Sequence, residues 1–229
     1  MSRKVPPVLG FFALVASLSA TPISCTGLIT LQAYINLGTA GCTVEDKLFF
    51  GFFYVPTGGA PAATAIGVSA INNGSNIQGL AFGPFVVTSA SDIGIGYNVM
   101  SLAGPTIGGA GLAIRGVGGS GSWAVAVTKA FCLGSIITSP TSCSDGISPA
   151  SLLSAFVLPP DPGNGDSISF LPVGLIGVFE DIVLIPGSGP LAISFVDNQF
   201  TQIPEPASTA LIGGGLVLLT GLWKYRRRS

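Results

Sequence analysis

A chain of 229 residues is long enough for one domain with a sizeable hydrophobic core. Hydrophobic residues make up 48% of it and charged residues only 8%, while 33 glycines and 17 prolines favour turns over long helices. Six of the nine basic residues lie near the two ends, which leaves three basic against nine acidic residues between them. This distribution lacks the clustered Lys and Arg that bind phosphate backbones, so nucleic acid is excluded as a partner.

The first twenty residues have the pattern of a secretory signal peptide. Arg3 and Lys4 precede an apolar stretch at 8–18, and small residues follow at 17–20. This stretch is too short for a bilayer-spanning helix, which needs about 20 apolar residues. We therefore predict export by the general secretory machinery and removal of residues 1–20 by cleavage. A lipoprotein signal that makes Cys25 the first residue is the alternative, but the residues before this cysteine fit it poorly.

Four cysteines form two pairs that are local in sequence, Cys25 with Cys42 and Cys132 with Cys143. In an exported protein this pattern favours two disulfide bridges, although four cysteines permit three connectivities and four reduced thiols are the alternative. The chain contains no histidine and no Cys-x-x-Cys, so we expect no zinc site.

The body contains short runs of branched and aromatic residues separated by Gly, Pro and Asn turn signals. Strands are predicted at 47–55, 64–71, 80–88, 93–102, 112–117, 123–131, 152–158, 167–170, 174–184 and 191–196. Strands at this spacing, without helical periodicity, favour an all-β fold, and we predict an antiparallel β-sandwich of jelly-roll or Ig-like type. A helical turn within 174–184 is the alternative for that run.

Paired acids are the candidates for catalysis. The absence of histidine removes Ser-His-Asp and Cys-His chemistry and most zinc catalysis. Carboxylate pairs remain in principle, with Glu45, Asp46, Glu180 and Asp181 as candidates. Because adjacent residues on a strand point to opposite faces, we expect these acids not to act together. The chain is therefore predicted to be non-catalytic and to need no cofactor.

Other polar and aromatic residues are candidates for binding. Asp161, Asn164 and Asp166 offer oxygen ligands, but their spacing is not that of an EF-hand, and an ordinary turn is expected. Asn73-Gly74-Ser75 matches a glycosylation acceptor and also an Asn-Gly turn. Trp123 or Tyr97, if exposed, would stack on sugar rings, whereas core packing is the more ordinary role of such aromatics.

The last residues combine three features in a fixed order. Pro204-Glu205-Pro206 is followed by 207–223, which carry no charge and just reach transmembrane length. A basic cluster follows, made of Lys224, Arg226, Arg227 and Arg228. The positive-inside rule places residues 224–229 in the cytoplasm and the body outside. We therefore predict that a C-terminal helix anchors the exported chain in the inner membrane, at least transiently.

This tail closely resembles the PEP-CTERM sorting signal of Gram-negative bacteria. The resemblance implies that the protease exosortase recognises Pro204-Glu205-Pro206 and releases the body to the cell surface or the extracellular matrix. The chain would then consist of a signal peptide (1–20), a β-sandwich surface domain (21–202) and a sorting signal (203–229). The predicted function is that of a surface or matrix protein, associated with exopolysaccharide or biofilm. An adhesin or carbohydrate-binding module is the alternative.

Overall fold

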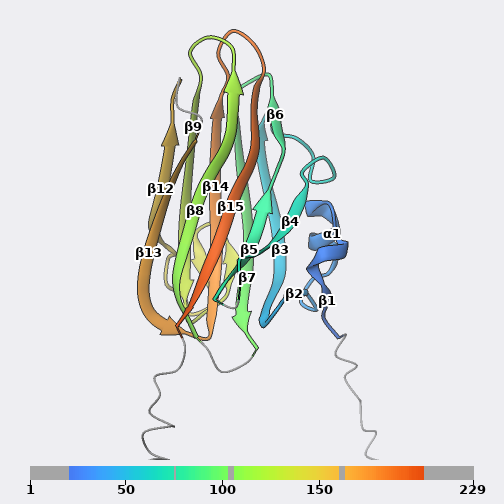
Figure 1. Ribbon diagram of the computed structural model, residues 1–229, viewed down its shortest axis with the longest axis vertical. Coiled ribbons are helices and arrows are strands. Elements are labelled where there is room, and N and C mark those ends of the chain that lie inside the picture. Colours follow the sequence, from blue (N-terminus) through green and yellow to red (C-terminus); the bar gives the residue numbers. More distant parts are fainter. Residues whose placement is uncertain (1–20, 75, 103–105, 160–162, 204–229) are drawn as a thin grey trace, which may run out of the picture.

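The computed structural model describes residues 21–74, 76–102, 106–159 and 163–203. They form two sheets packed face to face, as Figure 1 shows. The seven-stranded sheet has the order β1 (Ile23–Ser24), β2 (Cys42–Val44), β3 (Lys47–Gly58), β7 (Ser91–Ser101), β14 (Leu175–Ile185), β9 (Ala124–Leu133), β12 (Ala150–Val157). The six-stranded sheet has the order β13 (Gly163–Val173), β8 (Thr106–Gly119), β15 (Leu191–Ile203), β5 (Ile77–Phe82), β4 (Val68–Asn72), with β6 (Phe85–Val87) also paired to β15.

From β7 onward the chain crosses repeatedly between the two sheets. Strands β7, β9 and β14 belong to the seven-stranded sheet, and β8, β13 and β15 belong to the six-stranded sheet. Nearly all pairs are antiparallel, and the short β1–β2 pair is parallel. Crossing connections of this kind are typical of double-sheet jelly rolls. The predicted antiparallel β-sandwich is confirmed at the level of its architecture.

The core lies between the sheets and is filled by every second residue of the long strands. In β7 the inward side chains include Ile95, Tyr97 and Val99, all fully buried. Tyr97 lies at the centre of an aromatic cluster, with ring contacts to Phe49, Phe52, Phe82 and Phe200. Because these rings come from both sheets, the cluster joins the two layers.

Each predicted run overlaps a strand, but 80–88 is divided between β5 and β6, and β8 and β13 are much longer than the runs predicted at 112–117 and 167–170. Residues 174–184 form strand β14 and not a helical turn. The run at 64–71 begins as strand only at Val68, and the last strand continues to Ile203. Several short elements were not predicted. They are strands β1 and β2, helix α1 (Leu31–Asn36) with the 3₁₀ turn η1 (Cys25–Gly27) before it, and the hairpin of β10 (Ile137–Ser139) and β11 (Ser142–Cys143).

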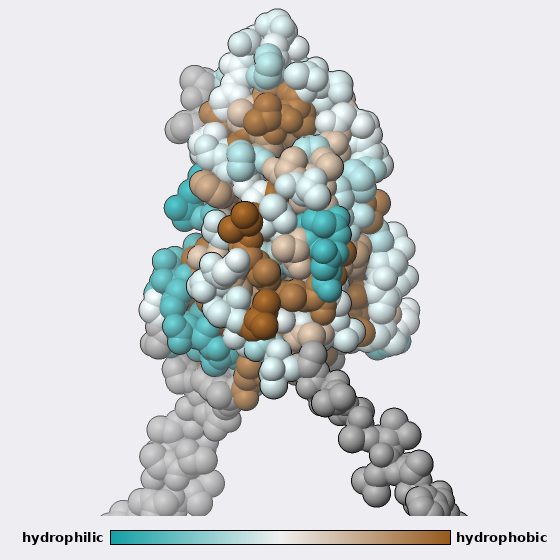
Figure 2. All heavy atoms as spheres, turned by 90° about the vertical axis from the view of Figure 1, so that its right-hand side faces the viewer, coloured by the Kyte–Doolittle hydropathy of each residue, from teal (hydrophilic) through white to brown (hydrophobic). Residues whose placement is uncertain are grey.

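Both expected disulfides are present, Cys25–Cys42 and Cys132–Cys143. The first ties the N-terminal segment to strand β2, and Tyr34 of α1 donates a hydrogen bond to the Cys25 carbonyl. The side of the molecule that carries α1 and β4 shows apolar patches interrupted by polar residues (Figure 2). The apolar surface on this side is therefore divided into separate patches.

The structure corrects the predicted localisation through a membrane-anchored helix. In the described part of the chain no helix is long and apolar enough to cross a membrane. The six residues of α1 rise only about 9 Å, against a hydrocarbon core of about 30 Å. The segments predicted as signal peptide (1–20) and as sorting signal (204–229) lie outside the described residues.

The outer face of the seven-stranded sheet is covered in part by the β10–β11 hairpin. Asn98 of β7 accepts a hydrogen bond from the Ile137 backbone N–H at 2.7 Å. At Gly177 of β14 the two backbones approach so closely that a Cβ would lie 2.2 Å from the Ile137 nitrogen. The Cys132–Cys143 bridge and the stacked rings of Phe53 and Phe179 pack beside this contact. A glycine at 177 is therefore required for the hairpin to cover the sheet.

We predict that Gly177→Ala destabilises the protein by about 2 kcal/mol, because the added methyl group overlaps hairpin backbone that cannot move aside cheaply. Urea unfolding measures the change. Gly174→Ala is the matched control, since nothing lies within 4 Å of a Cβ at that position. Equal stability of the two variants would contradict the close packing of the hairpin.

Candidate functional site

The outer face of the six-stranded sheet has a floor of small residues. Strand β8 places Gly109, Gly111 and Ala113 on this face, and β5 places Gly79 and Ala81 there. The residues between them on β8, such as Ala110 and Leu112, point into the core. Because glycine and alanine leave little side-chain volume, the face is hollowed along β8.

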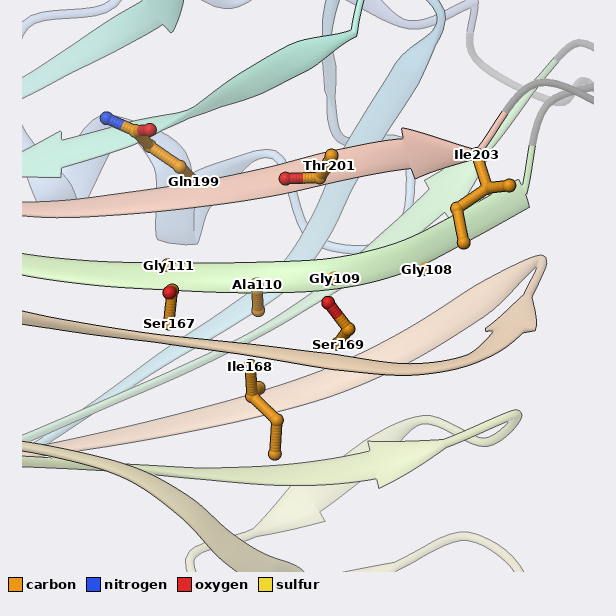
Figure 3. Close-up of a pocket in the computed structure, with 10 residues that line it drawn as sticks. All are labelled: Gly108, Gly109, Ala110, Gly111, Ser167, Ile168, Ser169, Gln199, Thr201 and Ile203. Carbon is orange, nitrogen blue, oxygen red and sulfur yellow. The ribbon is translucent and has the colours of Figure 1, made fainter.

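Free polar side chains border this floor on both sides. Ser167 and Ser169 lie on β13, opposite Gly111 and Gly109. Gln199 and Thr201 of β15 pair with the same two glycines from the other side. Figure 3 shows these residues around the groove, with Ile168 directed away from it. In the part of the chain that the structure describes, none of these four polar side chains hydrogen-bonds another protein group.

The hollow continues toward an ion pair and an exposed aromatic ring. Arg115 of β8 forms a salt bridge with Asp197 of β15, and the Arg115 side chain is 61% exposed. Burial raises the pKa of the Asp197 carboxyl, and the positive charges of Arg115 and Lys129 partly offset that rise. Phe195, the cross-strand partner of Arg115, is 38% exposed and lines the same hollow with Ser69 and Asn72.

Three adjoining hollows make one groove. The first, of about 290 Å³, lies over Gly108–Gly111, and the second, of about 170 Å³, shares Gly111, Ser167 and Gln199 with it. The third, of about 380 Å³, shares Asp197 with the second. Along β15 the groove extends from Ile203 to Phe195, about 26 Å at a rise of about 3.3 Å per residue. We call this surface the β8–β15 groove.

The predicted catalytic acids do not form a site. Glu180 is fully buried between the sheets, whereas Asp181 lies on the outer face of the seven-stranded sheet, near Asp92 of β7. This agrees with the expectation that neighbouring acids on a strand face opposite ways. Glu45 accepts a hydrogen bond from Asn72 at 2.7 Å, and Asp46 accepts one from Gln202. The four carboxylates therefore make separate contacts and do not form one site.

The other predicted binding residues also have structural roles. Asn164 donates to the Phe156 carbonyl, and Asp166 accepts from the backbone of Ser154 and Ser167. Asp161 and Ser75, from the predicted calcium and glycosylation motifs, lie outside the described residues. Trp123 is 7% exposed and Tyr97 is fully buried, so both aromatics belong to the core and cannot stack on a ligand.

The β8–β15 groove was not predicted from the sequence. Its residues are common ones, and the glycines of β8 resemble loop glycines when they are read along the chain. The available signal was the alternation in 109–115, where Gly, Gly, Ala and Arg occupy every second position between apolar residues. That alternation indicates a strand with a small-residue outer face.

No protein-family model and no curated protein matches the chain. Several solved structures of carbohydrate-binding modules are found as matches to part of the chain. One is TmCBM61 in complex with β-1,4-galactotriose, with 13% identity over 67% of this chain and 88% of that one, and a TM-score of 0.34. Another is a family 11 module from Clostridium thermocellum with a mixed-linked tetrasaccharide, with 12% identity over 72% and 93% of the two chains, and a TM-score of 0.30. At these scores the likeness carries no argument about function.

We predict that Asp181 makes the stability depend on pH. Burial raises the pKa of Asp181 to about 6, and a hydrogen bond and repulsion from Asp92 add to the rise. Between pH 3.8, the ordinary pKa, and about pH 6, the folded protein therefore holds a proton on Asp181 that the unfolded chain has lost. This contribution to stability is lost as the pH rises through about 6. Asp181→Asn should gain stability relative to the wild type between pH 4 and pH 8, about the window set by these values.

Thermal unfolding at the two pH values measures this difference. Asp92→Asn removes the repulsion but leaves Asp181 buried, so it should show a smaller gain in the same direction. If Asp92→Asn and the wild type change in parallel with pH, the two carboxylates do not interact.

Proposed function

We propose that the protein is a non-catalytic surface module that binds polysaccharide in the β8–β15 groove. The observation that carries this proposal is the free set of hydroxyl and amide groups over a glycine floor, formed by Ser167, Ser169, Gln199 and Thr201. A sugar chain presents many hydroxyl groups that both donate and accept hydrogen bonds. Neutral side chains that do the same, without partners in the protein, match that chemistry.

The other end of the groove supports the same ligand class. The exposed ring of Phe195 offers an apolar surface on which a sugar ring would stack. The exposed Arg115 guanidinium beside it adds hydrogen-bond donors. The open length of about 26 Å fits several sugar units in a row better than a single one. We therefore propose an extended, neutral polysaccharide as the ligand.

An enzymatic role receives less support from the same groove. Hydrolysis of a glycosidic bond ordinarily needs two carboxyl groups on either side of the bond. Of the acids that line the groove, Asp197 is paired with Arg115, and Asp166 accepts hydrogen bonds from backbone N–H groups. Both carboxylates are already held in structural contacts. Binding without catalysis is the function that these residues support best.

We predict that Gly111→Val weakens polysaccharide binding at least tenfold while the fold is kept. The nearest atoms to a Cβ at position 111 are the Gln199 Cβ at 3.7 Å and the Asp166 carbonyl oxygen at 4.0 Å, so a side chain fits but fills the groove. Isothermal titration calorimetry with β-1,4-galactan, mannan and mixed-linked β-glucan identifies the ligand. For that ligand the variant should lose at least tenfold in affinity, or about 1.4 kcal/mol.

Gly118→Val is the matched control, because it lies on the same strand with nothing within 4 Å of a Cβ and does not line the groove. It should bind like the wild type. Unchanged affinity of Gly111→Val would place the binding site elsewhere. Failure of the folded wild type to bind any neutral polysaccharide would refute the proposed function.

We also propose that Pro204-Glu205-Pro206 is a processing signal, on the strength of its resemblance to PEP-CTERM tails. The expected result is that the chain recovered from a host with exosortase ends near this motif, whereas a host without the protease yields the longer form. Intact mass of the recovered protein distinguishes the two forms and reveals any attached glycan. A chain that ends at Ser229 in both hosts would refute the signal.

A further inference from the structure

Three buried polar side chains meet in the otherwise apolar core. Lys129 of β9, Glu180 of β14 and Asn198 of β15 are each fully buried. The first two belong to the seven-stranded sheet and the third to the six-stranded sheet. Charged side chains are rarely buried unless they are paired, so this cluster needs an explanation.

Lys129 and Asn198 each have a neighbour in common with the other, Glu180 on one side and strand β8 on the other. Lys129 and Glu180 are direct cross-strand partners, and Asn198 Nδ2 donates to Glu180 Oε2 at 2.9 Å. Lys129 Nζ donates to the carbonyl of Gly111 at 3.0 Å, and the next residue, Leu112, is the cross-strand partner of Asn198.

The ring of Phe200, which lies near Asn198 on β15, is also close to the Lys129 amine. Lys129 Nζ lies 5.7 Å from the centre of the Phe200 ring. Phe200 follows Asn198 by two residues, so the two side chains point from β15 into the core together. The amine therefore lies between the carbonyl of β8 and the ring of β15, on the side from which Asn198 projects.

Several polar atoms in and beside this cluster lack hydrogen-bond partners. Glu180 Oε1, Asn198 Oδ1 and the Tyr97 hydroxyl are buried without a hydrogen-bond partner among the described residues. In that same part of the chain no carboxylate lies within 4.0 Å of Lys129 Nζ. Buried unpaired polar atoms cost free energy, and a stable fold rarely retains several of them together.

Burial also favours the uncharged forms of the amine and the acid. It lowers the pKa of Lys129 to about 8 and raises the pKa of Glu180 to about 7. The negative charges of Glu180 and Asp197 oppose the first shift, and Lys129 and the hydrogen bond from Asn198 oppose the second. The two pKa values lie about one unit apart, so a proton moves readily between the groups, and the neutral amine, which is a nucleophile, is populated near pH 8.

We propose that Lys129 and Asn198 form an intramolecular isopeptide bond, with Glu180 as the group that transfers the proton. Lys129 Nζ attacks Cγ of Asn198, and the bond from Cγ to Nδ2 breaks. The Glu180 carboxyl gives a proton to the leaving nitrogen and takes one from Nζ, so the products are one secondary amide and one ammonia. The step needs no oxidant, reductant or co-reactant, and the carboxyl ends as it began.

The other buried lysine shows why the proposal is specific. Lys47 is also fully buried, but its Nζ donates to Gln78 Oε1 at 2.8 Å and lies 3.4 Å from Asp46 Oδ1. Its charge is compensated by a carboxylate, and its amide neighbour has the oxygen, not the carbon, directed to the amine. Lys47 therefore serves as the internal control for Lys129.

Proteolytic peptide mapping of the full chain, folded with its disulfides and held at about pH 8, tests the proposal. We expect a branched peptide that joins the Lys129 and Asn198 segments and is lighter than their sum by one ammonia, about 17 Da. Mapping is needed because the Asn73-Gly74 and Asn164-Gly165 steps can also lose ammonia by forming a cyclic imide. Unlinked Lys129 and Asn198 peptides alone, from folded wild-type protein, would overturn the proposal.

Variants separate the role of Glu180 from a general effect on folding. Glu180→Gln keeps the size and the hydrogen bond but removes the proton transfer, and we expect the bond to form about a hundredfold more slowly or not at all. Lys47→Met should still form the bond. Unchanged bond formation in Glu180→Gln would remove this residue from the reaction. The wild-type peptide map decides the existence of the bond even if a variant fails to fold.

Discussion

The structure depends on one constraint, the alternation of side chains along strands that are buried on one face only. In β15 this alternation directs Val196, Asn198 and Phe200 into the core and Asp197 and Gln199 to the outer face. The same rule applied to β8 and β13 gives a packed interior and a polar exterior from one set of strands. The core and the groove are therefore two faces of the same three strands, and the spacing of residues in one sets the spacing in the other.

The outer faces of the two sheets differ in what lies against their small residues. On the seven-stranded sheet, Gly177 admits the backbone of the β10–β11 hairpin, and Phe53 covers Gly96 so closely that a Cβ there would overlap its ring. On the six-stranded sheet, the space beside Gly111 is open to solvent. The disulfide Cys132–Cys143 fixes the hairpin over the first sheet. What remains exposed on the second sheet is the surface available to a ligand.

The sequence predicted the architecture better than the candidate site, and the reason is physical. Strands such as 47–55 and 123–131 are marked by local composition, and both disulfides join cysteines that are close in sequence. Helix α1 has only six residues, and Thr30 caps it through a single hydrogen bond, a signal too short to recognise. The groove combines residues from β4, β5, β8, β13 and β15, and the buried cluster combines residues from β9, β14 and β15, so their members become neighbours only once the order of the strands is known.

Gly111 connects the buried cluster with the groove. Its carbonyl accepts the hydrogen bond from Lys129 inside the sandwich, while its Cα forms part of the groove floor outside. Asn198 and Gln199 are likewise neighbours on β15 that face the two sides. A covalent bond between Lys129 and Asn198 would fix β15 to β9 across the core and so hold the polar row of the groove in place. Because a rigid site loses less conformational entropy when it binds a flexible chain, the cross-link would favour binding of an extended polysaccharide on the opposite face of the same strand.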